Sequence, residues 1–548
     1  MFITESGCIF IPASATVQRC MHRDLLLVIG LLFAVSLFTL LSPKLRIAYP
    51  ILLVLGGLVI AFIPGIPHVR VDPELIFLIF LPPLLYEAAW FTSWREFWRW
   101  RRSISMLAFG LVFFTSLVVG YFTTWLIPGF TLGLGFLLGG IISPPDAVAA
   151  TSVLKGVHIP KRATTILEGE SLVNDASSLI VFRFALAAVM TGHFTPHLAV
   201  QQFFIVSLGG IAAGLALGGV IYLLHRTLPT TASIDTAMTL MTPYLMYIIA
   251  EEFHASGVLA VVSGGLFLSY RSHAFLDHRA RIQAYNVWST LIFMLNGLVF
   301  ILIGLDLPDI VSGMGSDELS EAIMYGLVVS VLVIVIRFVW MYPAAHVPRL
   351  LFSSIRMRET SPGWRVPTVL SWAGMRGVVS LASALSIPND LPNGDPFPHR
   401  STILVITFVV ILVTLVGQGL TLPWVVKKLK VQEVDPRKPE EEQELLLRGR
   451  MVRAVIDHLE SIPEKTPQIE RTQQHFLHLE QNYLRSIESL QNAEHAGQRD
   501  DTNRAYARLL ISLQRGALES ARKEHTFDLE VIRKMESNLD LEETRLNS

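Results

Sequence analysis

Residues 168–178 read EGESLVNDASS and lie inside a long apolar run of the chain. Ser171 and Asp175 are four residues apart, so on a helix they stack on one face, and Glu170 and Asn174 stack beside them. A charged group in lipid costs about 2.5 kcal/mol or more, so it needs a partner, a water-filled cavity or a function. The stretch therefore predicts a membrane helix that carries a stripe of oxygen-bearing side chains.

Apolar runs of this kind recur almost without pause up to residue 426. Each is long enough to cross, or nearly cross, a hydrocarbon core of about 30 Å as a helix. We count thirteen, with approximate extents 25–41, 47–64, 73–92, 103–127, 132–154, 164–190, 200–224, 233–253, 256–270, 287–305, 320–343, 366–388 and 401–426. Because the runs are continuous rather than alternating, the sequence predicts an all-α membrane protein with about 13 transmembrane helices.

Charged residues are unevenly distributed along the 548 residues, of which 52% are hydrophobic and 16% charged, with a mean hydropathy of +0.50. Residues 1–426 contain 46 charged residues, about 11%, whereas residues 427–548 contain 43, about 35%. We therefore expect an N-terminal extension over 1–24, a transmembrane domain over 25–426, and a cytosolic helical tail over 427–548.

The tail carries apolar residues at three- and four-residue spacings, which is typical of helices that solubilise or regulate a membrane domain. These residues are Phe476, Leu479, Tyr483, Ile487, Leu490, Tyr506, Leu509 and Leu513. The N-terminal extension lacks the apolar core of a secretory signal, and Met21 is an alternative start. Cys8 and Cys20 both precede the first apolar run, so neither a disulfide framework nor a thiolate metal site is expected.

The loops between the runs indicate the topology, because basic residues stay on the cytoplasmic side of a membrane protein. Thirteen spans with the N-terminus outside and the C-terminus inside place seventeen loop Lys and Arg residues in the cytoplasm and four outside. The cytoplasmic ones are Lys44, Arg46, Arg95, Arg99, Arg101, Arg102, Lys155, Lys161, Arg162, Arg226, Arg271, Arg279, Arg281, Arg349, Arg356, Arg358 and Arg365, and the outer ones are Arg19, Arg23, Arg70 and Arg400.

The fifth predicted helix contains a second carboxylate, Asp146, in the sequence SPPDAVA. Pro144 and Pro145 remove two backbone donors and clash with the preceding turn, so we expect this helix to break near the middle of the bilayer. Broken helices at that depth form the substrate sites of secondary transporters. Oxygen ligands from Asp146, Asp175, Ser171 and carbonyls near Pro145 suit a hard cation such as Na⁺ or Li⁺. No His or Cys lies in either stretch to favour zinc or copper.

The twelfth predicted helix contains Arg376 in the sequence GMRG, where glycine lets helices approach or unwind. If two six-helix repeats flank the seventh helix in opposite orientations, the fifth and twelfth helices are equivalent. Both carry an interruption, one at Pro-Pro and one at Gly-x-x-Gly, as paired discontinuous helices do. We therefore expect two inverted six-helix repeats with discontinuous helices 5 and 12.

Further charged residues lie in the predicted helices. For Glu170 and Arg376, a fixed ion pair between two helices is favoured over direct contact with a substrate. Arg183 and Arg337 are candidates for lining a polar cavity. Glu87 in the third helix fits either a cavity lining or a structural role, and the sequence leaves both open.

The combination of these motifs resembles the cation:proton antiporter-1 family of sodium/proton exchangers, in particular its bacterial, NhaP-like members, over about residues 25–426. The motifs are GESLVND at 169–175, Asp146 upstream, GMRG at 374–377, Pro82-Pro83 near Glu87, and GLVF at 297–300 running into Gly304-Leu305. The resemblance implies that Asp175 carries the cation or the proton, that Asp146 and Ser171 are supporting ligands, and that Glu170 pairs with Arg376. It also implies a homodimer in the bacterial inner membrane.

Two positions refine what the resemblance implies. Asn174 matches the family's asparagine, where the electrogenic branch has a second aspartate, and this suggests electroneutral exchange of one proton per cation. Many members have proline directly after the aspartate of the broken helix, whereas here Ala147 follows Asp146 and the prolines precede it.

A carboxylate in a partly desolvated cavity binds either a proton or a cation but hardly both, so exchange becomes obligatory. We therefore predict a secondary antiporter that exchanges Na⁺ or Li⁺ for H⁺ by alternating access at a midplane Asp site, with neither a cofactor nor enzymatic activity. K⁺/H⁺ antiport is the alternative. A cation channel, or an intramembrane protease with Asp146 and Asp175 as an aspartic dyad, is less favoured because of the helix breaks and the buried arginines. The net charge of −1 excludes electrostatic capture of nucleic acid.

Overall fold

The computed structural model describes residues 13–45, 47–63, 73–154, 157, 159–192, 196–311, 314–358, 361, 363–431, 440–462, 466–491 and 514. Its first helices are α1 (Ala13–Leu45), α2 (Tyr49–Ala61), α3 (Pro73–Phe91), α4 (Trp94–Ser105), the π-helix η1 (Met106–Leu111), α5 (Val112–Leu126), α6 (Leu132–Ile142), α7 (Ala147–Leu154), α8 (Lys161–Thr191), α9 (Pro196–Thr227), α10 (Ala232–Glu252) and α11 (Gly257–Phe275). The remaining helices are α12 (His278–Leu305), α13 (Leu307–Val311), α14 (Ser316–Leu351), α15 (Ser353–Arg358), α16 (Arg365–Trp372), α17 (Val378–Leu385), α18 (Arg400–Leu412), the π-helix η2 (Val413–Gln418), α19 (Gly419–Leu429), α20 (Glu440–Ser461) and α21 (Pro467–Gln491).

The membrane helices follow the predicted apolar stretches, each of which overlaps one described helix or a consecutive group of them. Eight segments among the described residues are long and apolar enough to cross a membrane: Leu25–Leu45, Trp94–Leu126, Leu132–Leu154, Lys161–Thr191, Val200–Thr227, Arg279–Leu305, Ser316–Leu351 and Arg400–Leu429. Shorter apolar helices cover Tyr49–Ala61, Phe77–Phe91 and Gly257–Ser272. The prediction of an all-α membrane protein is confirmed.

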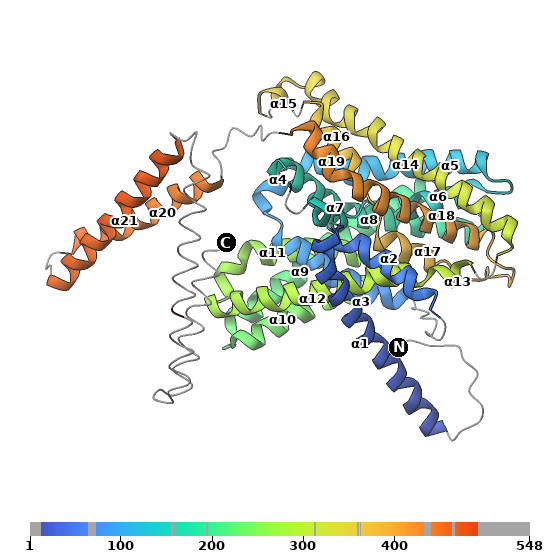
Figure 1. The fold of residues 1–548 in the computed structure, drawn as a ribbon, viewed down its shortest axis with the longest axis horizontal. Helices are drawn as coiled ribbons and strands as arrows, with labels where there is room; N and C mark the ends of the chain where they lie inside the picture. The colour runs from blue at the N-terminus through green and yellow to red at the C-terminus, as the bar shows by residue number, and fades with distance from the viewer. Residues whose placement is uncertain are drawn as a thin grey trace. The chain divides into compact units, whose positions relative to one another are not determined.

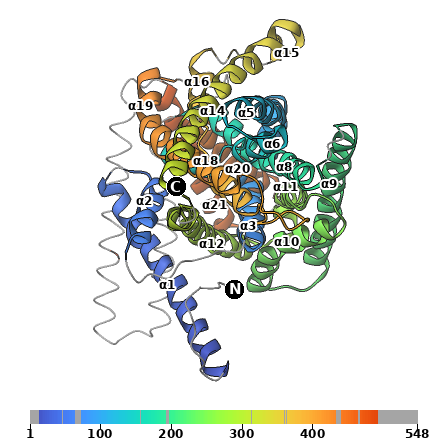
Figure 2. The same ribbon diagram turned by 90° about the vertical axis from the view of Figure 1, so that its right-hand side faces the viewer.

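The outward faces of these helices present large apolar side chains to their surroundings. Trp125 at the end of α5 is 80% exposed, and Phe204 on α9 and Val331 on α14 are also exposed. On its inner side, α9 packs on α11, where Gly210 and Gly214 bring the two backbones together (Figure 2). Since water would disfavour so much apolar surface, the outer faces are suited to lipid tails.

Two helices of the membrane unit are interrupted near their middle, where the sequence predicts it. The first breaks at residues 143–146 between α6 and α7, and the second breaks at residues 373–377 between α16 and α17 (Figure 1). Pro144 and Pro145 lack the amide hydrogens that would continue α6. The breaks leave two helix ends pointing into the protein interior at each interruption.

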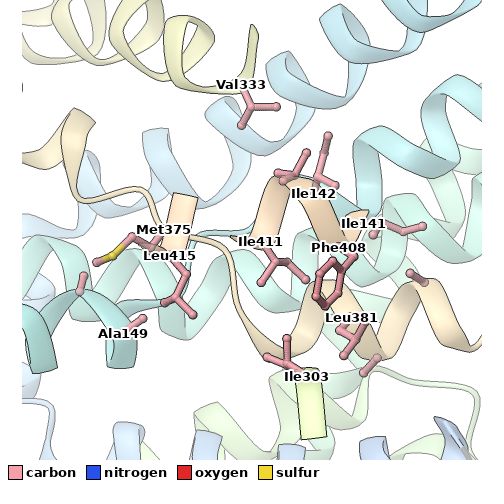
Figure 3. Close-up of a cluster of buried hydrophobic side chains, with 14 of the residues drawn as sticks. Ile141, Ile142, Ala149, Ile303, Val333, Met375, Leu381, Phe408, Ile411 and Leu415 are labelled. Atoms are coloured by element: carbon pink, nitrogen blue, oxygen red, sulfur yellow. The ribbon is translucent and has the colours of Figure 1, made fainter. Parts of the chain in front are cut away.

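Apolar side chains from several helices pack around the interruptions. Met375, in the second break, lies beside Leu415 of η2, and Ile142 at the end of α6 lies in the same cluster (Figure 3). Phe408 of α18 and Leu381 of α17 extend the cluster on the other side. All five side chains are at least 95% buried, so the irregular backbone is packed in protein rather than in lipid.

The residues described beyond Val431 form a second compact unit. In it, α20 packs against α21, with Ile456 fully buried and Arg453 bound to Glu480 at 3.5 Å. Phe476, Leu479 and Tyr483 are half-buried on α21, as the predicted apolar spacing requires. The side chains of Ile487 and Leu490, and residues Tyr506, Leu509 and Leu513, lie outside the described part.

The backbones of α2 and α12 touch through two glycines. A Cβ on Gly57 would overlap the carbonyl oxygen of Ile301, and a Cβ on Gly304 would overlap that of Val54. This contact joins α2 to the helix that lines the cavity described below, so the approach of α2 and α12 depends on the absence of side chains at these positions.

We expect Gly304→Ala to destabilise the membrane unit by about 1–3 kcal/mol, because overpacking a tight contact forces backbone shifts. Thermal unfolding of the detergent-solubilised protein measures the effect. Gly219→Ala on α9 is the matched control, since nothing lies within 4 Å of its would-be Cβ. Equal unfolding midpoints for the two variants would contradict the close approach of α2 and α12.

Candidate functional site

A cavity of about 830 Å³ enters the membrane unit between α3, α7, α8, α12 and α17. Asp146, Ser171, Asp175 and Pro145 all line it, so of the five residues that the sequence proposed for cation or proton binding only Asn174 is absent from the wall. Glu87 and Glu168 line the same cavity. Asp175 is 9% exposed, which places its carboxyl group in contact with the cavity rather than sealed in the core.

Asp146 begins α7 and uses one of its carboxylate oxygens to cap that helix. Its Oδ1 accepts hydrogen bonds from the amides of Val148 at 2.8 Å and Ala149 at 3.3 Å. Its Oδ2 occupies the space beside Gly377 that a Cβ at this position would fill. One oxygen therefore fixes the side chain, and the other faces the second interruption.

Ser171 and Asn174 tie α8 to the first interruption. The Ser171 hydroxyl accepts a hydrogen bond from the Ala147 amide at 3.3 Å, and the Asn174 side-chain amide donates to the Pro145 carbonyl at 3.2 Å. Asn174 is fully buried and is absent from the cavity wall, whereas Pro145 lines it. Asn174 thus holds the Pro145 carbonyl in place instead of facing the cavity.

The two interruptions are bonded directly to each other. The amide of Asp146 donates to the carbonyl of Met375 at 2.7 Å, and Nε of Arg376 donates to the carbonyl of Ile142 at 3.0 Å. The Arg376 guanidinium also donates to the Gly374 carbonyl, and the Arg376 backbone amide donates to the Thr414 hydroxyl at 3.1 Å. These bonds satisfy backbone groups that the breaks would otherwise leave unpaired in the interior.

The predicted ion pair between Glu170 and Arg376 is wrong in its partner. Glu170 binds Arg337 of α14 through two hydrogen bonds, at 2.6 and 2.8 Å, and both side chains are about 1% exposed. Arg337 reaches the site past Gly374, whose missing side chain leaves room for its guanidinium. The side-chain hydrogen bonds of Arg376 go to backbone carbonyls instead, those of Ile142 at the end of α6 and of Gly374.

The first half of each interrupted helix is therefore capped at its C-terminus by an arginine side chain. Arg376 binds the last carbonyl of α6, and Nε of Arg337 donates to the Leu370 carbonyl in the last turn of α16 at 3.0 Å. A cation at a helix C-terminus is favourable because the terminal carbonyls carry partial negative charge. The sequence showed the buried arginines but not which helix end each one caps.

The predicted cavity role of the other arginines is not found. Arg183 is 53% exposed and binds Glu251 of α10 at 3.0 Å, and neither Arg183 nor Arg337 lines the cavity. Their positions on long helices could not be oriented from sequence because no partner motif fixes the helix rotation. Of the three possible lining residues, only Glu87 is found in the wall.

Several polar residues of the wall were not proposed from the sequence as site residues, and Glu168 and Ser380 are two of them. Glu168 is seven residues before Asp175 on α8, two helical turns away on the same face, so helical periodicity could have found it. Ser380 of α17 also lines the cavity, and it lies among apolar residues with no motif to mark it.

The charge balance of the site is negative. Glu170 is neutralised by Arg337, whereas among the described residues the carboxylates of Asp146 and Asp175 have no ion-pair partner. Uncompensated carboxylates in the wall of a cavity attract a small cation or a proton. The arrangement can therefore bind a hard cation in water-accessible space without a resident cofactor.

Comparisons with known proteins show the family and the fold of this chain. The family model described as "Sodium/hydrogen exchanger, transmembrane" matches residues 30–428. An uncharacterised Na⁺/H⁺ exchanger of Mycobacterium tuberculosis is 32% identical over 95% of this chain and 96% of its own length. A sodium, potassium, lithium and rubidium/H⁺ antiporter of Bacillus subtilis is 36% identical over 69% of this chain and 57% of its own length. The solved sodium proton antiporter MjNhaP1 of Methanocaldococcus jannaschii has the same fold, with a TM-score of 0.58 at 19% identity over 75% of this chain and 100% of its own.

The revised ion pair gives a testable expectation. Arg337→Met should cost about 3–5 kcal/mol of stability, because it leaves Glu170 as an unpaired buried charge, and adding Glu170→Gln should recover part of that loss. A double-mutant cycle on thermal unfolding measures the coupling. The same cycle with Arg376→Met is the control, and coupling of Glu170 to Arg376 as strong as to Arg337 would refute the assignment.

Proposed function

We propose that this chain, which belongs to the sodium/hydrogen exchanger family, exchanges Na⁺ or Li⁺ for H⁺ across the bacterial inner membrane by alternating access. The observation that carries the proposal is that Asp146 and Asp175, which have no ion-pair partner in the part of the chain that the structure describes, line one cavity where two interrupted helices meet. Crossed broken helices with an ion site between them are the arrangement that secondary transporters use.

Competition at Asp175 accounts for obligatory exchange. Its carboxyl group has no hydrogen-bond donor or ion-pair partner among the described residues, so it is free to take either ligand. A bound proton removes the charge that attracts Na⁺, and a bound Na⁺ disfavours the proton. Asp146 and Ser171 then act as supporting ligands, with Asp146 offering the oxygen that does not cap α7.

The accessible side of the cavity follows from a topology with the N-terminus outside. In that topology the end of α3 and the start of α12 are cytoplasmic, and Thr92 and Tyr285 from these ends line the cavity. The site in this conformation would then open to the cytoplasm. The thirteen proposed spans would form two inverted six-helix repeats. Rocking of these repeats around the ion site would then open the site to the outside.

Electroneutral exchange is the stoichiometry that Asn174 favours. A second aspartate at this position would add a titrating carboxylate, whereas the Asn174 amide donates to the Pro145 carbonyl and carries no charge. With one carboxyl group that alternates between cation and proton, one H⁺ moves for each Na⁺. The homodimer and a regulatory or solubilising role for the tail over 427–548 remain part of this proposal.

K⁺/H⁺ antiport is the second candidate, and one observation favours it. The Bacillus subtilis relative is named for sodium, potassium, lithium and rubidium, so a similar membrane domain accepts cations of several sizes. A cation channel fits less well, because the interrupted helices bond to each other across the site instead of surrounding a continuous pore.

We expect Asp175→Asn to abolish Na⁺-driven proton flux, because an amide neither titrates nor binds a cation as a carboxylate does. Dye-quenching measurements in everted vesicles or proteoliposomes, with Na⁺, Li⁺ and K⁺ in parallel, give the readout. Asp317→Asn, at an exposed position in the first turn of α14, is the matched control. Flux at the normal rate in Asp175→Asn would reject the assigned role.

The proposed stoichiometry is tested separately. An imposed membrane potential should neither drive nor slow Na⁺ uptake in proteoliposomes, since no net charge moves in a one-for-one exchange. ²²Na⁺ uptake at equal pH on both sides, with potassium diffusion potentials of either sign, measures this. A steep dependence on potential would show that more than one proton moves per cation.

A further inference from the structure

Ser380 is a buried hydroxyl group that the proposed exchange does not yet use. It lies in the first turn of α17, directly after the second interruption, and it lines the cavity beside Asp146. Its side chain is 1% exposed, and its Oγ has no hydrogen-bond partner in the part of the chain that the structure describes. A buried hydroxyl without a partner is costly, so this one requires an explanation.

Ser380 differs from the other unpaired buried hydroxyl groups in its place in the cavity wall. Many buried hydroxyl groups of these helices donate to the carbonyl three or four residues earlier, as Ser177 does to Asn174 at 2.9 Å and Ser371 does to Pro367 at 2.7 Å. Ser380 makes neither bond. Among the described residues, Thr115, Ser116, Ser207 and Thr407 also carry buried hydroxyl groups without a partner, but of this set only Ser380 lines the cavity.

The position of Ser380 relative to Asp146 indicates which ligand that is. Gly377 is the N-cap residue of α17, and Ser380 follows it by three residues in the first turn. The Asp146 Oδ2 lies against Gly377, and this is the carboxylate oxygen that does not cap α7. Ser380 and Asp146 both line the cavity, so the residue with the unpaired hydroxyl and the residue with the free carboxylate oxygen share its wall.

We propose that Ser380 is a ligand of the transported cation, so that both interrupted helices, and not α7 alone, supply oxygen atoms to the site. This inference rests on the proposed exchange and adds a residue that the sequence motifs do not contain. The hydroxyl oxygen offers lone pairs to a hard cation such as Na⁺ or Li⁺ without adding negative charge.

A neutral ligand on a short helix also affects selectivity between cations. The α17 turn is held by packing against α18 and α6, so its hydroxyl cannot follow a larger ion outward as freely as a loop could. Ser380 therefore favours Na⁺ and Li⁺ over K⁺, because a fixed oxygen selects the cation whose size matches its position.

Ser380→Ala tests the proposal in proteoliposomes, with proton flux measured against the concentration of Na⁺, Li⁺ and K⁺. We expect the KM for Na⁺ and Li⁺ to rise by about tenfold or more, as for other lost polar contacts with a charged group, while the maximal rate is largely kept. The KM for K⁺ should change less, so the preference for Na⁺ over K⁺ falls. Ser386→Ala at the end of the same helix is the control, since Ser386 lies outside the cavity wall and donates to the Ser383 carbonyl.

Ser380→Cys provides a second variant of nearly the same volume in case the alanine variant does not fold. Its sulfur is a soft, poor ligand for Na⁺, so it should raise the KM for Na⁺ in the same direction. Unchanged KM values for all three cations in either folded variant, with wild-type protein that exchanges normally, would overturn the role of Ser380 alone. Absence of exchange in the wild-type protein would instead overturn the proposed function.

Discussion

The crossing of two interrupted helices is the constraint on which the rest of the site depends. At the depth of the breaks there is no bulk water to satisfy free amides and carbonyls, so each must find a partner in the protein. The Asp146 amide meets the Met375 carbonyl, and the Arg376 guanidinium meets the Ile142 carbonyl. Each interruption thus completes the hydrogen bonds of the other, and neither could persist in the membrane without its counterpart.

The same crossing sets the charge of the cavity. Two buried arginines cap α6 and α16, and they bring basic groups to the centre of the protein. Glu170 neutralises Arg337 in a closed pair at 2.6 Å, away from the cavity wall. The carboxylates of Asp146 and Asp175 then remain free of cationic side chains, and they give the cavity its attraction for cations. Glu170 thus serves the structure, whereas Asp175 on the same helix and Asp146 in the first interruption are left for binding.

Sequence alone predicted much of the fold, because hydrophobic length and helix-breaking residues have local causes. Pro144 and Pro145 predict the first break, GMRG predicts the second, and the four-residue spacing of Ser171 and Asp175 predicts their shared face. What could not be predicted depends on how helices are rotated against each other. Glu170 has two buried arginines as possible partners, and only the packed structure shows that Gly374 admits Arg337. Ser380 was missed for a related reason: its place in the cavity wall and its lack of a hydrogen-bond partner among the described residues depend on how the helices pack.

The paired bonds across the interruptions also limit how the protein can move. Moving the first interruption relative to the second would break both of the hydrogen bonds that join them in the protein interior. The crossed pair should thus travel as a single rigid block that carries its ion with it. Relative motion should then take place elsewhere, at the apolar contacts between that block and the surrounding helices, where no hydrogen bonds have to break.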